Sequence, residues 1–294
     1  MTNTLHMAGF DLGSRAMLVS LTISHWTARK LDKRVTNETN QRHNAASDAG
    51  RYNKALVDKK ALAPILSVIN EARAQYFAYT LPWHDGGHRL LPAKAFAKFS
   101  DKMRNLRWDF EREVAAFVAA YPQHIDRARA TLGDIFNEVD YPAADDLVGK
   151  FAFDTSIMPM PVADDFRVSL SDDLLAGVRT AIASEIEAKT KTAHNDLVGR
   201  VTEVVGTMAE KLKAYDPALG VGIFRDSLVG NVAKLADLLP ELNVTDDSNI
   251  DALAAALKSI SDVDADDLRG DKALRDSTAN EAARLAELAK TYLA

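Results

Sequence analysis

One short stretch of the sequence contains several side chains of the types that bind metal ions. His84, Asp85 and His88 lie close together between two stretches that are predicted to be helical. Imidazole nitrogens and carboxylate oxygens are ordinary ligands of zinc and other divalent ions. The spacing crosses Gly86 and Gly87, so no helical turn would arrange the three ligands in advance. We therefore predict a rigid turn without a metal, and these three residues stay weak candidates for a metal site.

Other motifs of catalysis or cofactor binding fail at their defining positions. The string that ends at Gly149 and Lys150 lacks the first glycine and the hydroxyl of a phosphate-binding loop. The acids from Asp262 to Asp266 resemble the start of a calcium loop, but Asp267 replaces its glycine and Ala273 its glutamate. The sequence contains no cysteine, which excludes a thiolate nucleophile and a disulfide. We predict no cofactor and no catalytic residue; an unrecognised metal-dependent hydrolase centred on the histidine loop is the last alternative.

Charge is unevenly distributed along the chain. The net charge is -6, but residues 15–112 contain 18 Lys and Arg against 9 Asp and Glu, and residues 113–294 contain 18 against 32. Such a basic segment can attract nucleic acid through its phosphates. The side chains that would make these contacts are Arg29, Lys30, Lys33, Arg34, Arg42, Arg51, Lys54, Lys59 and Lys60. Nucleic-acid binding is therefore an alternative function, although the pI of about 5.7 and the absence of a nucleic-acid motif count against it.

The aromatic residues divide the chain into two parts. Of 21 Phe, Tyr and Trp residues, only Tyr215, Phe224 and Tyr292 follow Ser171. Aromatic side chains bury large apolar areas and so favour a compact core. We predict a mixed helical domain over residues 1–170, closed by short strands, and an Ala- and Leu-rich helical arm or bundle over residues 171–294. The predicted fold class is mostly α with a small β element.

Two segments alternate between apolar and polar residues, as strands with one buried face do. They are residues 17–24 and residues 166–170, and we expect them to pair. Between them the clearest helix is predicted over residues 93–121, where apolar residues recur at steps of three and four. Further along, Asp216 and Pro217 are expected to begin a helix that runs to Leu239.

An apolar stripe with helical spacing begins the second part of the chain. A continuous helix over residues 172–214 would be roughly 60 Å long, which suggests a coiled-coil arm. The stripe thins between Thr190 and Asp196, so a break there is the alternative. One helix cannot bury this stripe alone, and we expect it to be the assembly surface. Its residues are Leu175, Val178, Ile182, Ile186, Leu197, Val201, Val204, Met208 and Leu212.

Several short strings together resemble one protein family. They are Leu18–Ser24 followed by Trp26, Gly50–Lys54, Thr80–Trp83, Arg89–Pro92, Leu132-Gly133, Phe136-Asn137, Tyr141-Pro142, Pro161 and Phe166–Val168. In these strings the chain is similar to an uncharacterised family of bacteriophage and bacterial proteins with a domain of unknown function. Its members tend to be encoded near MoxR-type AAA+ ATPases and von Willebrand A-domain proteins. The resemblance implies an accessory role beside a remodelling ATPase and supplies no catalytic residue.

These features favour a protein that acts by assembly rather than by catalysis. We predict a non-catalytic phage or bacterial accessory protein that forms a homo-oligomer, binds a protein partner such as an AAA+ ATPase, or does both. No stretch approaches the about 18 to 20 apolar residues of a membrane helix, and no export signal is visible. We therefore expect no membrane contact and a cytoplasmic location, which is the host cytoplasm if a phage encodes the protein.

Overall fold

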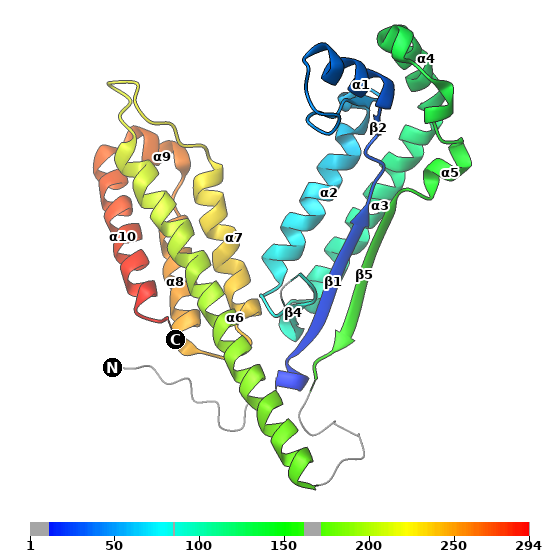
Figure 1. The fold of residues 1–294 in the computed structure, drawn as a ribbon. Helices are drawn as coiled ribbons and strands as arrows, with labels where there is room; N and C mark the ends of the chain where they lie inside the picture. Colours follow the sequence, from blue (N-terminus) through cyan, green and yellow to red (C-terminus); the bar gives the residue numbers. More distant parts are fainter. Residues whose placement is uncertain (1–11, 85, 162–171, 294) are drawn as a thin grey trace. The chain divides into compact units, whose positions relative to one another are not determined.

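The structure, a computed structural model, describes residues 12–84, 86–161 and 172–293 (Figure 1). The chain forms two compact units, and each is built from segments that are separated in the sequence. The bundle unit comprises Met1–Ser20, Phe77–Phe99 and Ile157–Ala294, and the aromatic unit comprises Leu21–Tyr76 and Ser100–Ser156. The predicted boundary near residue 170 stays a prediction, because these units follow spatial contacts and not a single cut in the chain.

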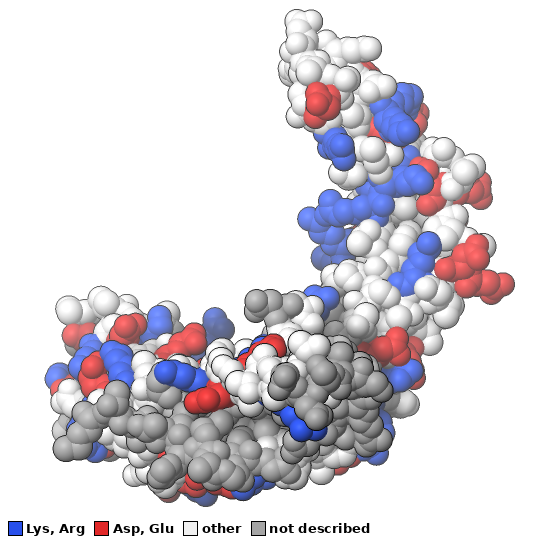
Figure 2. Space-filling view, turned by 60° about the horizontal axis from the view of Figure 1, so that its bottom comes forward, with Lys and Arg blue, Asp and Glu red and all other residues white. Residues whose placement is uncertain are grey.

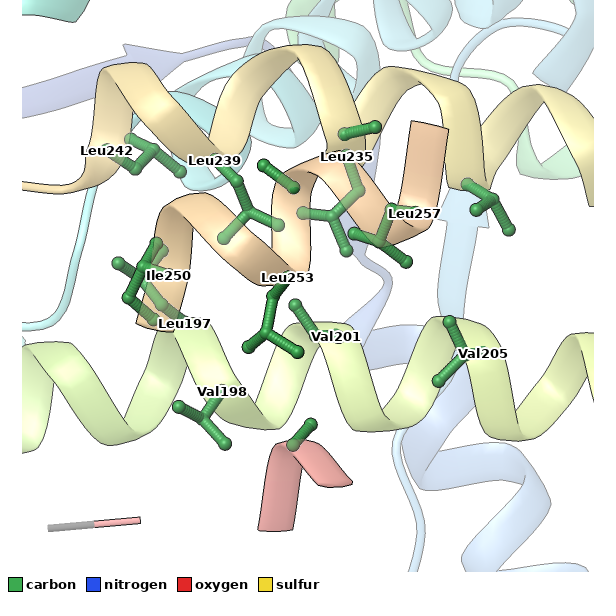
Figure 3. Close-up of a cluster of buried hydrophobic side chains, with 14 of the residues drawn as sticks. Leu197, Val198, Val201, Val205, Leu235, Leu239, Leu242, Ile250, Leu253 and Leu257 are labelled. Carbon is green, nitrogen blue, oxygen red and sulfur yellow. The ribbon is translucent and has the colours of Figure 1, made fainter. Parts of the chain in front are cut away.

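The bundle unit is built mainly from helices. α6 packs along α10, and α7 packs along α8. Aliphatic side chains of α6, α7 and α8 point toward one another and form the core, as Figure 3 shows. The helices are α6 (Asp172–Ala214), α7 (Ser227–Leu242), α8 (Ser248–Ser261), α9 (Ala265–Gly270) and α10 (Lys272–Lys290). The predicted fold class, mostly α with a small β element, is correct.

α6 is one uninterrupted helix of 43 residues, about 65 Å long at the usual rise per residue. The alternative of a break between Thr190 and Asp196 is therefore wrong. The stripe thins in sequence there because small and polar residues face the core, where Thr190, Ala193 and His194 are all buried. The Thr190 hydroxyl donates a hydrogen bond to the Ile186 carbonyl (2.7 Å), so its burial leaves no unpaired donor.

Aspartates cap three helices of the bundle. The carboxylates of Asp247, Asp264 and Asp271 accept backbone hydrogen bonds at the starts of α8, α9 and α10 (2.9, 2.7 and 3.0 Å). Such caps satisfy amides that have no partner inside the helix. Asp264 belongs to the run that resembles a calcium loop, and its role in the structure is helix capping.

The small sheet has the strand order β4-β1-β5. The strands are β4 (Arg89–Pro92), β1 (Ala16–Ser24) and β5 (Ala152–Pro159). β1 is antiparallel to β4, with Ala16 opposite Pro92 and Val19 opposite Arg89. β1 was predicted from its alternation, but its expected partner, residues 166–170, lies outside the described residues. The described neighbours of β1 are instead β4 and β5.

The aromatic unit packs its rings between helices and the ends of strands. Trp26 lies against Phe117 and Tyr121, with ring centroids 6.2 and 5.8 Å apart, and Phe110 lies 5.7 Å from Phe153. The helix predicted over residues 93–121 is α3 (Phe96–Ala119). The other elements are β2 (Arg29–Leu31), α1 (Lys33–Arg42), β3 (Asn53–Ala55), α2 (Lys59–Tyr79), α4 (Tyr121–Leu132) and α5 (Ala144–Val148).

Within the described ranges, no helix combines the length and the apolar character that crossing a membrane requires.

Candidate functional site

The structure divides the predicted assembly stripe of α6 into two halves. In the C-terminal half, Leu197, Val201, Met208 and Leu212 are buried in the bundle core, and Val204 packs against that core. This half of the stripe is covered by helices of the same chain, as the labelled residues Leu197 and Val201 in Figure 3 illustrate. These five residues therefore stabilise the fold of one chain.

The N-terminal half of the stripe differs. Leu175, Val178 and Ile182 are half-buried and do not belong to the bundle core, and Ile186 is the first residue of the stripe to pack against it. Figure 1 shows this part of α6 continuing past the ends of the other bundle helices. We call residues 174–186 of α6 the α6 extension. Among the described residues of the bundle unit, it is the part of the long helix without a helical partner.

The Thr80–Pro92 segment forms a fixed hairpin that holds α6 in the bundle unit. Leu81 and Leu90 exchange backbone hydrogen bonds (2.8 and 2.9 Å). The guanidinium of Arg200, on α6, donates to the carbonyls of Ala78 and Thr80 (2.9 and 2.7 Å). Trp83 is buried in the core, and the Arg89 guanidinium donates to the hydroxyl and the carbonyl of Thr80 (2.7 and 3.1 Å), so these residues of the segment have structural roles.

The candidate metal ligands are not brought together around a cation site in the described residues. The His84 Nδ1 atom lies 2.7 Å from the ammonium of Lys189, whose charge opposes a metal ion there. The His88 carbonyl accepts a hydrogen bond from the His84 amide (3.2 Å), which closes the turn. Asp85 lies outside the described residues. No group of three potential ligands occurs in the part of the chain that the structure describes.

The structure exposes eight of the nine predicted phosphate contacts and buries the ninth. The exposed side chains are Arg29, Lys30, Lys33, Arg34, Arg42, Arg51, Lys59 and Lys60. Three acids of the same segment, Glu38, Asp48 and Asp58, are exposed as well. On the surface drawn in Figure 2, groups of Lys and Arg likewise adjoin groups of Asp and Glu. The segment is thus locally basic and does not form a uniform basic face.

Polar side chains of α1 hold this basic segment in one conformation. The Asn40 amide donates to the carbonyls of Ser47 and Gly50 (3.0 and 3.3 Å), and the Thr36 hydroxyl accepts from the Tyr52 amide (3.0 Å). Gly50 packs closely against Asn40, since a Cβ atom at this position would lie 2.9 Å from the Asn40 side-chain oxygen. The long connection between α1 and β3 is therefore fixed rather than loose.

Lys54 is the ninth predicted contact, and it is a buried structural cation. Its side chain is 4% exposed, and its ammonium lies 3.2 Å from Asp32, 2.7 Å from Asp140 and 2.7 Å from the Ile135 carbonyl. These three acceptors use its three donors, so none is left for a phosphate. As a phosphate contact, the Lys54 prediction is wrong, because Asp140 lies far away in sequence and was not visible as a partner.

The pKa values of Lys54 and Asp32 are both shifted in the direction that favours the charged form. Burial opposes the charge of Lys54, but the hydrogen bonds that it donates to Asp140 and Asp32 outweigh this effect and raise the pKa of the ammonium. A backbone hydrogen bond from Val35, together with Lys54, lowers the pKa of Asp32. Both ions are therefore held in their charged forms in the folded chain.

The fold defines a mostly α-helical protein with a small antiparallel sheet. The family model described as a protein of unknown function (DUF3150) matches residues 14–239, and the chain belongs to this family. No curated protein and no solved structure matches the chain. The family description assigns no activity.

Proposed function

We propose that this protein acts by assembly with another protein, through the α6 extension, and not by catalysis. The observation that carries the proposal is the stripe of Leu175, Val178 and Ile182. These apolar side chains recur at helical spacing on a helix that continues past its own core. A contiguous apolar stripe on a regular helix is the usual form of a helix–helix interface. The buried half of the stripe anchors the extension and so limits the entropy lost on binding.

Two partners are proposed for this surface. One is a second copy of the chain, which would form a homo-oligomer. The other is an AAA+ ATPase of the MoxR type, next to which similar phage and bacterial proteins tend to be encoded. Either role is that of a non-catalytic accessory protein in the cytoplasm, and both would use the same apolar side chains.

A single charge in the extension tests this proposal. Ile182→Asp should weaken association at least tenfold, because assembly would bury an unpaired carboxylate. Ser184→Asp adds the same charge to an exposed position of the same helix and should leave association unchanged. Light scattering at micromolar concentration measures the mass, and circular dichroism verifies the helix content. If the wild-type chain is strictly monomeric, copurification with the ATPase distinguishes the two variants, and equal recovery of both would contradict the proposal.

Nucleic-acid binding is the second candidate, because eight exposed cations lie between Arg29 and Lys60. If they contact phosphates, the double variant Lys30→Glu and Lys33→Glu should bind duplex DNA more weakly whatever its sequence. The dependence of log K on log salt should fall by about 0.9 for each lost contact. Lys234→Glu with Lys258→Glu changes the net charge equally on exposed bundle positions and is the control. Equal loss of binding in both double variants would point to net charge alone and reject the site.

A further inference from the structure

The strands β2 and β3 of the aromatic unit form a two-stranded ribbon, separate from the three-stranded sheet. They are antiparallel, with Arg29 opposite Ala55 and Leu31 opposite Asn53. Residues that lie directly opposite each other in a pair of strands share one face, and successive residues of a strand point to opposite faces. The four residues therefore lie on one side of the ribbon, which we call the ribbon face.

The opposite side of the ribbon fixes its orientation. Lys54 is the middle residue of β3, and its ammonium is held in the interior by Asp32 and Asp140 (3.2 and 2.7 Å). Because Lys54 points inward, its two neighbours in β3 must point outward. All four residues of the ribbon face are exposed, in agreement with this alternation. The buried ion pair thus directs the ribbon face toward solvent.

The ribbon and the residues beside it are basic. Residues 29–33 and 51–55 contain five Lys and Arg and a single acid, Asp32, whose carboxylate is paired with Lys54. The exposed acids of the wider segment lie on α1 and in the connections before and after β3, and they are Glu38, Asp48 and Asp58. Four cations of the ribbon region are exposed and form no ion pair with a described residue, and they are Arg29, Lys30, Lys33 and Arg51.

A ribbon of this charge matches the major groove of duplex DNA. That groove is about 12 Å wide and admits a two-stranded ribbon, whereas the minor groove is only about 6 Å wide. Arginine and asparagine are the side chains that form paired hydrogen bonds with the edges of guanine and adenine there. Arg29 and Asn53 both lie on the ribbon face. A lipid surface would require a larger apolar contact than Leu31, which is 36% exposed.

We propose that the ribbon face enters the major groove of duplex DNA, with Arg29 and Asn53 at the edges of the bases. The cations that would contact the flanking phosphates are Lys30, Lys33 and Arg51. This inference rests on nucleic-acid binding, the second candidate function above, and adds the groove, the contacting face and the residues that read the bases. The buried ion pair orders the ribbon before binding, which limits the entropy lost on docking.

Duplex DNA with a blocked major groove tests this placement. Glucosyl groups on 5-hydroxymethylcytosine fill that groove and leave the phosphates unchanged. The wild-type chain should bind an unmodified duplex of mixed sequence at least about tenfold more tightly than the glucosylated duplex of the same sequence. The double variant Arg29→Ala and Asn53→Ala should bind both duplexes equally, because it lacks the base contacts. Fluorescence anisotropy measures the dissociation constants, and circular dichroism verifies the fold.

A neutral substitution separates base contacts from phosphate contacts. Asn53→Ala alone should weaken binding to the unmodified duplex and leave the dependence of log K on log salt unchanged, because it removes no charge. Asn231→Ala with Lys234→Ala removes an amide and a positive charge from exposed positions of the bundle unit. This control should discriminate between the two duplexes as the wild-type chain does.

The outcomes distinguish this inference from the function on which it rests. Equal binding of both duplexes by the wild-type chain would refute the groove contact. If Lys30→Glu with Lys33→Glu still weakened binding in that case, contact with phosphates alone would remain. Absence of binding to either duplex would reject nucleic-acid binding as a whole. Binding to phosphatidylserine vesicles in its place, lost in the variant of Arg29 and Asn53, would reassign the ribbon face to a membrane.

Discussion

Replacement of Lys54 by Met is expected to destabilise the chain by about 3–5 kcal/mol, the usual cost of breaking a buried ion pair from one side. Without the ammonium, the carboxylates of Asp32 and Asp140 stay 11% and 13% exposed with no cation between them. The Ile135 carbonyl also loses its donor. Urea unfolding followed by circular dichroism measures the change. Lys59→Met, at an exposed position, is the control and should alter stability by less than about 0.5 kcal/mol.

The acid dependence of the same variant provides a sharper test. The lowered pKa of Asp32 stabilises the wild-type chain above its ordinary value of about 3.9, and this stabilisation is lost as the pH falls through the folded pKa. The raised pKa of Lys54 stabilises the chain below about 10.5, and this is lost as the pH rises through the folded pKa. In Lys54→Met, protonation relieves the carboxylate pair, so the deficit should shrink as the pH approaches 4. A deficit that is constant with pH would argue for lost packing instead.

Val201→Asp should have the other large effect, because Val201 is 0% exposed in the core that α6, α7 and α8 share. A carboxylate there has no partner, and the expected cost is several kcal/mol. Since this half of the stripe is covered within one chain, the bundle should lose helicity while the mass of the particle stays unchanged. The near-ultraviolet circular dichroism of the aromatic unit should persist.

Thr207→Asp is the matched control for this variant, since Thr207 is exposed on the same helix. Circular dichroism and light scattering on the two variants distinguish the cases. A drop in mass with full helicity in Val201→Asp would mean that this half of α6 is an interface between chains, contrary to the packing described above.

Local patterns in the sequence predict the regular elements well. The stripe of α6 and that of α3 identify long helices because their apolar spacing persists over many turns. β1 was identified as a strand because apolar and polar residues alternate in its sequence. β5 was not predicted, because its sequence, from Ala152 to Pro159, has apolar residues on both faces and a burial pattern without clear alternation.

The candidate sites could be predicted only in part, because they depend on contacts between residues that are distant in the sequence. The sequence around Lys54 does not distinguish it from the neighbouring exposed cations. Its burial depends on the ion pair with Asp140, which lies 86 residues further along the chain. The helix predicted from Asp216 is wrong, because α7 begins at Ser227. The turn signals of Asp216-Pro217 and of Gly220 and Gly222, both of which have positive φ, outweigh the apolar residues between them. The apolar groove that Phe110, Val148 and Phe151 line in the aromatic unit could not be foreseen, since α3 and the segment after α5 meet only in the folded chain.

Because the bundle unit is built from segments that are separated in the sequence, it can be completed only late in synthesis. Leu12, Leu18 and Leu90 share one hydrophobic core with helices that extend to Ala289. At translation rates of roughly 5–20 residues per second, the first of these side chains leave the ribosome on the order of tens of seconds before their last partners. The aromatic unit, whose last residue is Ser156, can close much earlier. The nascent chain should therefore carry exposed leucines, among them Leu12 and Leu18, until the final helices emerge, a period in which a chaperone has apolar surface to bind.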